Sequence, residues 1–145
     1  MTSSVVFIVD ASAMKATMSD PRAPQSCSMT SASGRSEAAS TSASITLIAL
    51  SSMVQVALAA AQMLEEVGIS AEVVDPRTTW PLDEHTLIES AKKTSRCIVI
   101  DEGYGRYGVT GELAAVVQEG AFYYLDAPVK RMGAMNVPIP FSPVL

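Results

Sequence analysis

Short apolar runs alternate with longer amphipathic segments from Ile45 to the end of the chain. The short runs predict strands at Ile45–Leu50, Ala71–Asp75, Arg96–Asp101 and Val129–Gly133. Between them, apolar residues recur at helical spacing and predict helices at Met53–Val67, Asp83–Lys93 and Val109–Leu125. Strands that alternate with helices form right-handed crossovers, so the strands lie parallel. The pattern predicts an α/β fold, a three-layer α/β/α sandwich with a mostly parallel sheet.

Residues that begin and end helices stand at the expected boundaries. Ser51 or Ser52 can cap the first predicted helix by accepting hydrogen bonds from unpaired backbone N–H groups. Gly68 supplies a left-handed stop after that helix. Asp83 caps the second helix, whose last turn carries two lysines that complement the helix dipole. Local sequence and periodic pattern therefore indicate the same order of elements.

The amino-terminal part of the chain departs from this pattern. Val5–Val9 is a short, fully apolar run and predicts a buried central strand of a parallel sheet. Residues 11–44 contain no Val, Ile, Leu, Phe, Tyr or Trp and are dominated by Ser, Ala and Thr. Such a segment buries too little to offset the entropy of ordering it, so we expect a disordered linker. The predicted parts are a remnant at 1–10, the linker at 11–44 and a folded domain at 45–145.

Charge and cysteine content argue against several classes of function. The net charge is −5 and no basic stripe is visible, which argues against nucleic acid as a partner. Cys27 and Cys97 lack metal-binding spacing and fit a reducing compartment, and Cys97 is expected to be a small core residue. No apolar run approaches the length of a membrane span. We expect a soluble, cytoplasmic protein without a metal site.

The segment Gly103–Gly108 has the literal pattern G-x-G-x-x-G between a predicted strand and a predicted helix. A dinucleotide site is rejected, because Asp101 and Glu102 precede the first glycine and would repel a pyrophosphate. The acid expected after the following strand is also missing, since no Asp or Glu occurs after Asp126. We interpret the segment as a tight turn, with Thr110 or a backbone group capping the next helix.

Several single residues are candidates for binding rather than for catalysis. Arg106, near a helix amino terminus, could hold a small anion or the carboxylate of a partner. Arg77, at a strand end, could bind an anion or pair with a carboxylate or carbonyl at the domain edge. Glu102 and Asp101 could form an acid/base pair, but nothing nearby completes a mechanism. His85 falls on a polar helix face and is expected to be solvated, so no self-contained active site is predicted.

Several segments, taken in order, resemble one protein family. Asp75-Pro76-Arg77 closes a strand, Trp80-Pro81-Leu82-Asp83 begins a helix, and Asp101-Glu102-Gly103 ends the next strand. The most specific segments are Tyr124–Arg131 and Val137–Pro143. Together they resemble the C-terminal domain of transketolase-type thiamine enzymes. More narrowly, they resemble the β subunit of the decarboxylating component of 2-oxoacid dehydrogenase complexes, of the pyruvate, branched-chain or acetoin type.

This resemblance implies a domain that does not carry the chemistry. In the family, a pyrimidine-binding domain precedes it, and only Val5–Asp10 resembles the last strand of that domain. The resemblance implies thiamine diphosphate and Mg²⁺ in the parent assembly and none bound by this chain alone. A truncated β subunit of this kind is expected to be inactive by itself, although it belongs to an oxidoreductase.

The resemblance also implies partners. The family assembles as a heterotetramer of two α and two β subunits, and this domain contributes to docking the acyltransferase core. Asp126 is a candidate docking residue by position, or else it caps the third predicted helix. Two alternatives stay open: an anion-binding regulatory module that uses Arg106, and the C-terminal domain of a transketolase or a deoxyxylulose phosphate synthase. The segments DAPVKR and VPIPFSP favour the dehydrogenase over the latter.

Residues 11–44 match nothing of the family's linker, and their Ser/Ala/Thr/Arg bias is typical of GC-rich DNA translated out of frame. We hypothesise a frame-disrupted gene product. Stop codons in the alternative frames of the coding DNA, or no family-like linker there, would eliminate this hypothesis.

Overall fold

The computed structural model describes residues 4–8 and 43–138. These residues form a five-stranded sheet in the order β1-β3-β2-β4-β5. The elements, in chain order, are β1 (Val5–Ile8), β2 (Ile45–Ala49), α2 (Met53–Glu66), β3 (Ala71–Asp75), α3 (Glu84–Thr94), β4 (Cys97–Tyr104), α4 (Val109–Ala121), the 3₁₀ turn η1 (Phe122–Tyr124) and β5 (Lys130–Ala134). In this part of the chain, no helix has the length and apolar character needed to cross a membrane.

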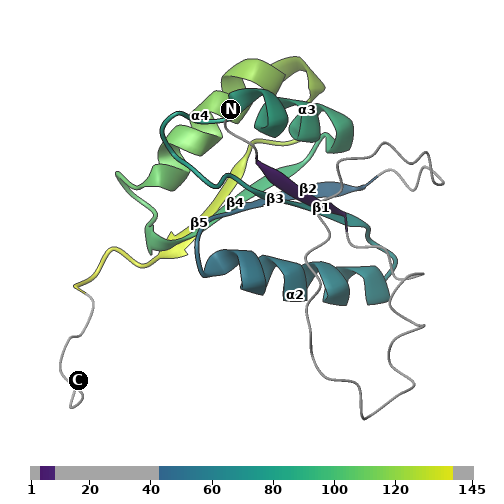
Figure 1. Ribbon diagram of the computed structural model, residues 1–145, viewed down its shortest axis with the longest axis horizontal. Helices are drawn as coiled ribbons and strands as arrows, with labels where there is room; N and C mark the ends of the chain where they lie inside the picture. The colour runs from purple at the N-terminus through teal and green to yellow at the C-terminus, as the bar shows by residue number, and fades with distance from the viewer. Residues whose placement is uncertain (1–3, 9–42, 139–145) are drawn as a thin grey trace, which may run out of the picture.

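The sheet lies between two helical layers, as the sequence predicts. Strand β2 pairs in parallel with β3 on one side and with β4 on the other, and β4 pairs in parallel with β5. Helix α2 covers one face of the sheet, whereas α3 and α4 cover the opposite face (Figure 1). The predicted α/β/α sandwich is confirmed.

The prediction for the first strand is wrong in direction and place. Strand β1 pairs antiparallel with β3, from Val5 opposite Asp75 to Ile8 opposite Glu72, and it lies at the edge of the sheet. An apolar run indicates that a strand can be buried, but it does not determine the neighbour or the direction of that strand. That this strand is the remnant of a preceding domain stays a prediction. Residues 11–42 of the predicted linker lie outside the described residues, whereas Ala43 is buried and Ser44 donates a backbone hydrogen bond to Ser70, so the folded domain begins two residues before the predicted boundary.

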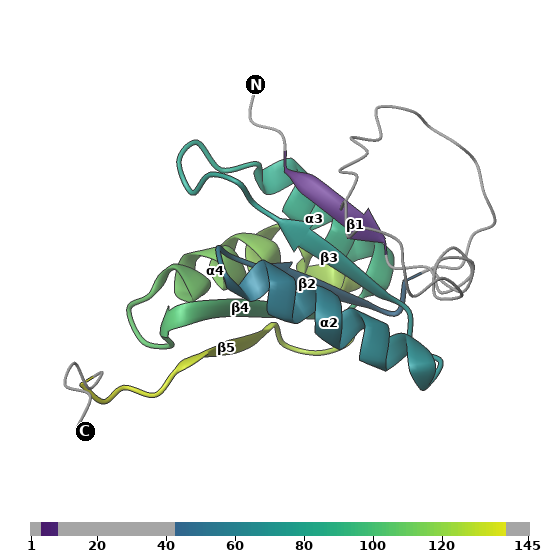
Figure 2. The ribbon, with the colours of Figure 1, turned by 60° about the horizontal axis from the view of Figure 1, so that its bottom comes forward.

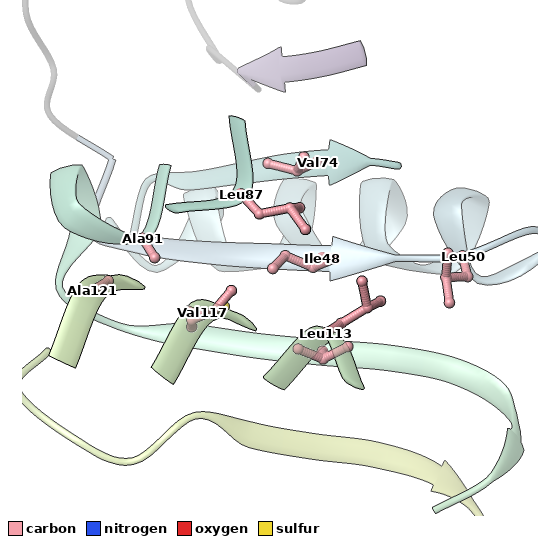
Figure 3. Packing of buried hydrophobic residues seen from close by; sticks show 10 residues of the cluster. Ile48, Leu50, Val74, Leu87, Ala91, Leu113, Val117 and Ala121 are labelled. Carbon is pink, nitrogen blue, oxygen red and sulfur yellow. The ribbon is translucent and has the colours of Figure 1, made fainter. Parts of the chain in front are cut away.

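The core has one apolar cluster on each face of the sheet. On the α3 and α4 face, Ile48, Leu87 and Leu113 are fully buried and point toward one another (Figure 3). On the α2 face, Ala57 and Ala61 are fully buried against the sheet. Their small side chains let this helix lie close to the strands. Some of its larger apolar residues lie on the opposite, exposed face of the helix.

The ends of α2 and α3 follow the predicted residues except at Ser52. Asp83 caps α3, because its Oδ1 accepts a hydrogen bond of 3.2 Å from the backbone N–H of Thr86. Gly68 has φ +82° beyond the end of α2, as expected for a left-handed stop. Ser52 stands at the N-cap of α2, but its side chain makes no capping hydrogen bond.

Two elements at the carboxyl side differ in length from the prediction. Strand β4 continues to Tyr104, so Asp101 and Glu102 belong to the strand and the following loop is shorter. Helix α4 ends at Ala121, and the three aromatic residues after it form η1 instead of a last helical turn. The helix predicted to Leu125 is therefore one turn too long.

Candidate functional site

The carboxyl ends of β2 and β4 form the point where the chain connections diverge. The helix after β2 covers one face of the sheet and the helix after β4 covers the other (Figure 2). In open α/β sheets, ligands bind outside the strand ends at such a point. Three of the candidate residues, Arg77, Glu102 and Arg106, follow or end strands on this side of the sheet.

Glu102 is engaged with the first turn of α2. The hydroxyl of Ser52 donates a hydrogen bond to its carboxylate Oε2. No acidic residue lies in the first turn of α2 itself, so Glu102 brings a negative charge to the positive end of that helix. This contact explains why Ser52 does not cap α2 with its own side chain. It also gives Glu102 a structural partner rather than a place in an acid/base pair.

Arg77 pairs with a carboxylate at the edge of the domain, which confirms one of the two predicted roles. Its Nε lies 3.5 Å from Oδ2 of Asp75, the last residue of β3. Both residues line a hollow of about 560 Å³, together with Leu50, Ser51, Pro76, Thr78, Thr79 and Trp80. Trp80 is 89% exposed at its rim. The hollow lies open at the strand ends, next to an exposed aromatic ring.

The glycine-rich segment is a turn only in part, because Gly103 and Tyr104 belong to β4 and residues 105–108 alone bend into α4. One glycine of this bend is sterically required. A Cβ on Gly108 would collide with the backbone carbonyl oxygen of Tyr104, whereas a Cβ on Gly105 would meet no atom within 4 Å. Gly108 has extended backbone angles and stands at the N-cap of α4. The expected cap from Thr110 is absent, since its buried hydroxyl has no hydrogen-bond partner among the described residues.

Arg106 lies in an open, mainly apolar groove of about 640 Å³ at the ends of β4 and β5. The groove is lined by Tyr104, Arg106, Tyr107, Asn136, Val137 and Pro138. Within the described ranges, no ion pair involves Arg106. Its guanidinium is therefore the single charge of this groove and is open to a negatively charged group from outside.

Asp126 lies at the other end of the sheet from these three residues. Its backbone N–H donates a 2.8 Å hydrogen bond to the carbonyl of Ser95, just before β4 begins. Its Oδ2 lies 3.7 Å from Nε of Arg96. It does not cap the third predicted helix, because α4 ends five residues earlier, at Ala121. The four candidates thus do not converge on one active site.

An exposed aromatic surface precedes Asp126, and sequence reasoning missed it. Phe122, Tyr123 and Tyr124 are all exposed on η1. The rings of Phe122 and Tyr123 meet edge to face with centroids 5.3 Å apart, and Nζ of Lys92 lies 5.5 Å from the ring centre of Tyr124. The signal was a run of three aromatic residues at a predicted helix end, where a helix that stops early leaves them outside the core.

His85 and Cys97 have the structural environments that the sequence predicted for them. His85 is exposed on α3, as expected for a solvated residue. Burial raises the pKa of the Cys97 thiol to about 12, which suits an unreactive core residue. Cys27 lies outside the described residues. Among residues 4–8 and 43–138, no three His, Cys, Asp or Glu side chains come together in a group that could hold a metal ion.

Comparison with known proteins places this geometry in a family. Residues 34–145 match the family described as transketolase, C-terminal domain. The chain is 48% identical over 101 residues to the acetoin:2,6-dichlorophenolindophenol oxidoreductase subunit beta of Bacillus subtilis (strain 168), covering 70% of this chain and 30% of that protein. It is 46% identical over 98 residues to the mitochondrial pyruvate dehydrogenase E1 component subunit beta-1 of Arabidopsis thaliana, covering 68% and 27%.

A solved structure gives the same indication for the fold. It is described as a split gene transketolase, inactive beta4 tetramer, and it superposes with a TM-score of 0.54 at 35% sequence identity. The match covers 64% of this chain and 30% of that chain. The chain thus spans about 30% of the length of the relatives that it matches.

Proposed function

The chain belongs to the transketolase C-terminal domain family, and we propose that it is the assembly and interaction domain of the β subunit of a thiamine-dependent 2-oxoacid dehydrogenase. In this proposal, the oxidative decarboxylation of the 2-oxoacid belongs to the whole complex and the chain alone is inactive. The names of the two curated relatives support a dehydrogenase over the alternatives of a transketolase or a deoxyxylulose phosphate synthase.

The observation that carries the proposal is the outer face of α2. Val56, Met63 and Val67 are 53%, 69% and 71% exposed, and their spacing of seven and four residues puts them on one face of the helix. The opposite face of α2 is already buried against the sheet through Val54 and Ala57. A helix that is apolar on both faces favours a partner on the outer face, because a contiguous exposed apolar strip marks an interaction surface.

The proposed partners are an α subunit and a second β subunit, which together form a heterotetramer, and the acyltransferase core of the complex. The tetrameric description of the structural relative is in line with such assembly. We assign the acyltransferase to the surface formed by Phe122, Tyr123, Tyr124 and Asp126. It combines exposed aromatic rings, which are enriched in interfaces, with a carboxylate that suits the polar rim of an interface.

Thiamine diphosphate and Mg²⁺ are proposed for the parent assembly. In this proposal the chain alone binds neither of them; among its described residues, no three His, Cys, Asp or Glu side chains form a group that could hold a metal ion. No step of the reaction is therefore assigned to residues of this chain.

The test mixes the purified chain with an α subunit of the pyruvate or acetoin type and measures the mass of the product by size-exclusion chromatography with light scattering. We expect a mixed assembly larger than either component. Met63→Glu should weaken it about tenfold or more, because the new charge must be desolvated in the interface. Ala115→Glu adds the same charge at an exposed position of α4 and should leave assembly unchanged. Separate elution at micromolar concentrations would contradict the proposal.

A second candidate function is an anion-binding regulatory module, and one observation favours it. Thr110 has a buried hydroxyl without a partner in the first turn of α4, and Arg106 stands unpaired in the loop before that turn. Titration of the ¹⁵N-labelled chain with 2-oxoacids and organic phosphates tests it through the backbone amides of this loop. No shift in the millimolar range would leave only the assembly role.

A further inference from the structure

Strand β5 presents a free edge. It is the outermost strand of the sheet, beyond β4 (Figure 2), and within the described ranges it pairs with β4 alone. Its first four residues, Lys130 to Gly133, are exposed. An edge strand carries backbone N–H and C=O groups that lack a ladder partner, so it is a template for one more strand.

The free edge carries positive charge on both faces of the sheet. Lys130 pairs with Ile98 of β4, which packs against the α2 cluster, so Lys130 lies on the α2 face. Arg131 is the next residue and therefore lies on the α4 face, where its Nη1 donates a 3.4 Å hydrogen bond to the carbonyl of Gly105. Neither cation forms an ion pair with a described carboxylate. In a chain of net charge −5, these unpaired cations are concentrated on one edge.

The groove around Arg106 continues this edge. Asn136, Val137 and Pro138, which line it, follow β5 directly along the chain, and Tyr104, which also lines it, pairs with Ala134 at the end of β5. A segment that extends along β5 would thus reach an apolar groove with a single guanidinium. The edge offers unpaired backbone groups and the cations Lys130 and Arg131. The groove adds the guanidinium of Arg106 and an apolar surface.

We propose that the free edge of β5 binds an extended, acidic segment of a partner protein by strand addition. Main-chain hydrogen bonds supply the affinity in this mode of recognition, and side chains supply the selection. Because the cations lie on both faces, the selected segment carries acidic residues at consecutive positions and an apolar residue for the groove. A second copy of the chain does not fit, because it would bring a second set of cations to the same ribbon. The inference does not depend on the proposed dehydrogenase role.

The experiment titrates the full chain into a short fluorescein-labelled peptide of consecutive glutamates followed by valines and measures fluorescence anisotropy. A peptide of the same sequence with alternate backbone nitrogens methylated serves as the control for strand addition. We expect saturable binding of the first peptide and loss of binding for the methylated one. Lys130→Gln combined with Arg131→Gln should weaken binding about fivefold, since each exposed ion pair contributes modestly.

The matched control variant combines Lys92→Gln with Arg96→Gln, which removes the same charge from α3 and the loop after it. It should bind the acidic peptide as the unaltered chain does. Equal binding of the methylated peptide would overturn strand addition, and equal weakening by the control variant would overturn the assignment to β5. Equally tight binding of a short single-stranded DNA would show an unspecific polyanion surface and would also overturn the proposal.

Discussion

The side-chain oxygens of Thr46 and Thr94 lie 2.7 Å apart, and this hydrogen bond joins the central strand β2 to the last turn of α3. The Thr46 hydroxyl also lies 2.9 Å from Oγ of Ser90 and 3.1 Å from its carbonyl oxygen. All three residues are buried. A satisfied polar cluster in a core fixes the position of a helix along a strand more narrowly than apolar contacts do.

Thr46→Val removes the central hydroxyl of this cluster while keeping the shape of the side chain. The remaining hydroxyls of Ser90 and Thr94 lose a buried partner, so we expect a loss of about 1 to 3 kcal/mol in the free energy of unfolding. Urea denaturation followed by circular dichroism measures it. Thr79→Val, at an exposed position, should change the stability by less than about 0.5 kcal/mol. Equal effects of the two substitutions would show that the cluster does not contribute.

The order of strands and helices was predictable because each element buries one face and its apolar residues follow its own period. Asp83 and Gly68 were predictable for the same local reason, since a cap or a stop acts on residues close in sequence. The Arg77–Asp75 pair is local as well. Of the two serines predicted to cap α2, Ser52 stands at the N-cap, but it makes no capping hydrogen bond. Its partner, Glu102, is fifty residues away and reaches it only through the pairing of β2 with β4.

The interaction surfaces were not predictable from periodicity. Helix α2 carries apolar residues on both faces, so its period alone does not tell whether the face of Met63 or the face of Ala57 packs on the sheet. The free edge of β5 follows from the strand order, and the sequence pattern does not contain that order. The antiparallel direction of β1 is a tertiary property in the same sense, since the run Val5–Ile8 has no alternation that distinguishes the two directions.

Gly133→Ala should loosen β5 from β4. A Cβ on Gly133 would stand 2.7 Å from the carbonyl oxygen of Gly103 and 3.1 Å from the nitrogen of Gly105. These are backbone atoms and cannot rotate away, so we expect the free energy of unfolding to fall by about 1 to 3 kcal/mol. Faster hydrogen exchange of the β5 amides, measured by mass spectrometry, should accompany it. Gly105→Ala is the matched control, because a Cβ there meets open space. An exchange pattern shared by both variants would contradict the close contact.

The cap of α3 should give a pH-dependent contribution to stability. Partial burial raises the pKa of Asp83, but hydrogen bonds from Thr86 and Ser4 outweigh it and hold the pKa below the usual value of 3.8. The contribution is therefore present above that value and is lost as the pH falls through the lower pKa of the folded state. Asp83→Ala should lower the free energy of unfolding by about 1 kcal/mol at neutral pH. The difference in this free energy between the variant and the unaltered chain should become smaller below pH 3.8.

Thermal unfolding at a series of pH values measures this difference. The control Glu119→Ala removes an exposed carboxylate from the last turn of α4 and should show only a small difference in unfolding temperature at neutral pH. A constant gap between Asp83→Ala and the unaltered chain at all pH values would mean that the carboxylate charge does not contribute to the cap.

Cys97 should be unreactive until the domain unfolds. The thiol is buried between β4 and the α3 and α4 layer, and burial raises its pKa to about 12, so the reactive thiolate is scarce at neutral pH. In a Cys27→Ser variant, Cys97 is the remaining cysteine, and its reaction with a disulfide reagent reports this site alone. We expect labelling at least about a hundredfold slower in buffer than in concentrated urea, because reaction requires opening of the core. Rapid labelling of the folded variant would show that β4 is not held between its neighbours as the structure describes. Strand β5, which pairs with β4, would then not be held in place either.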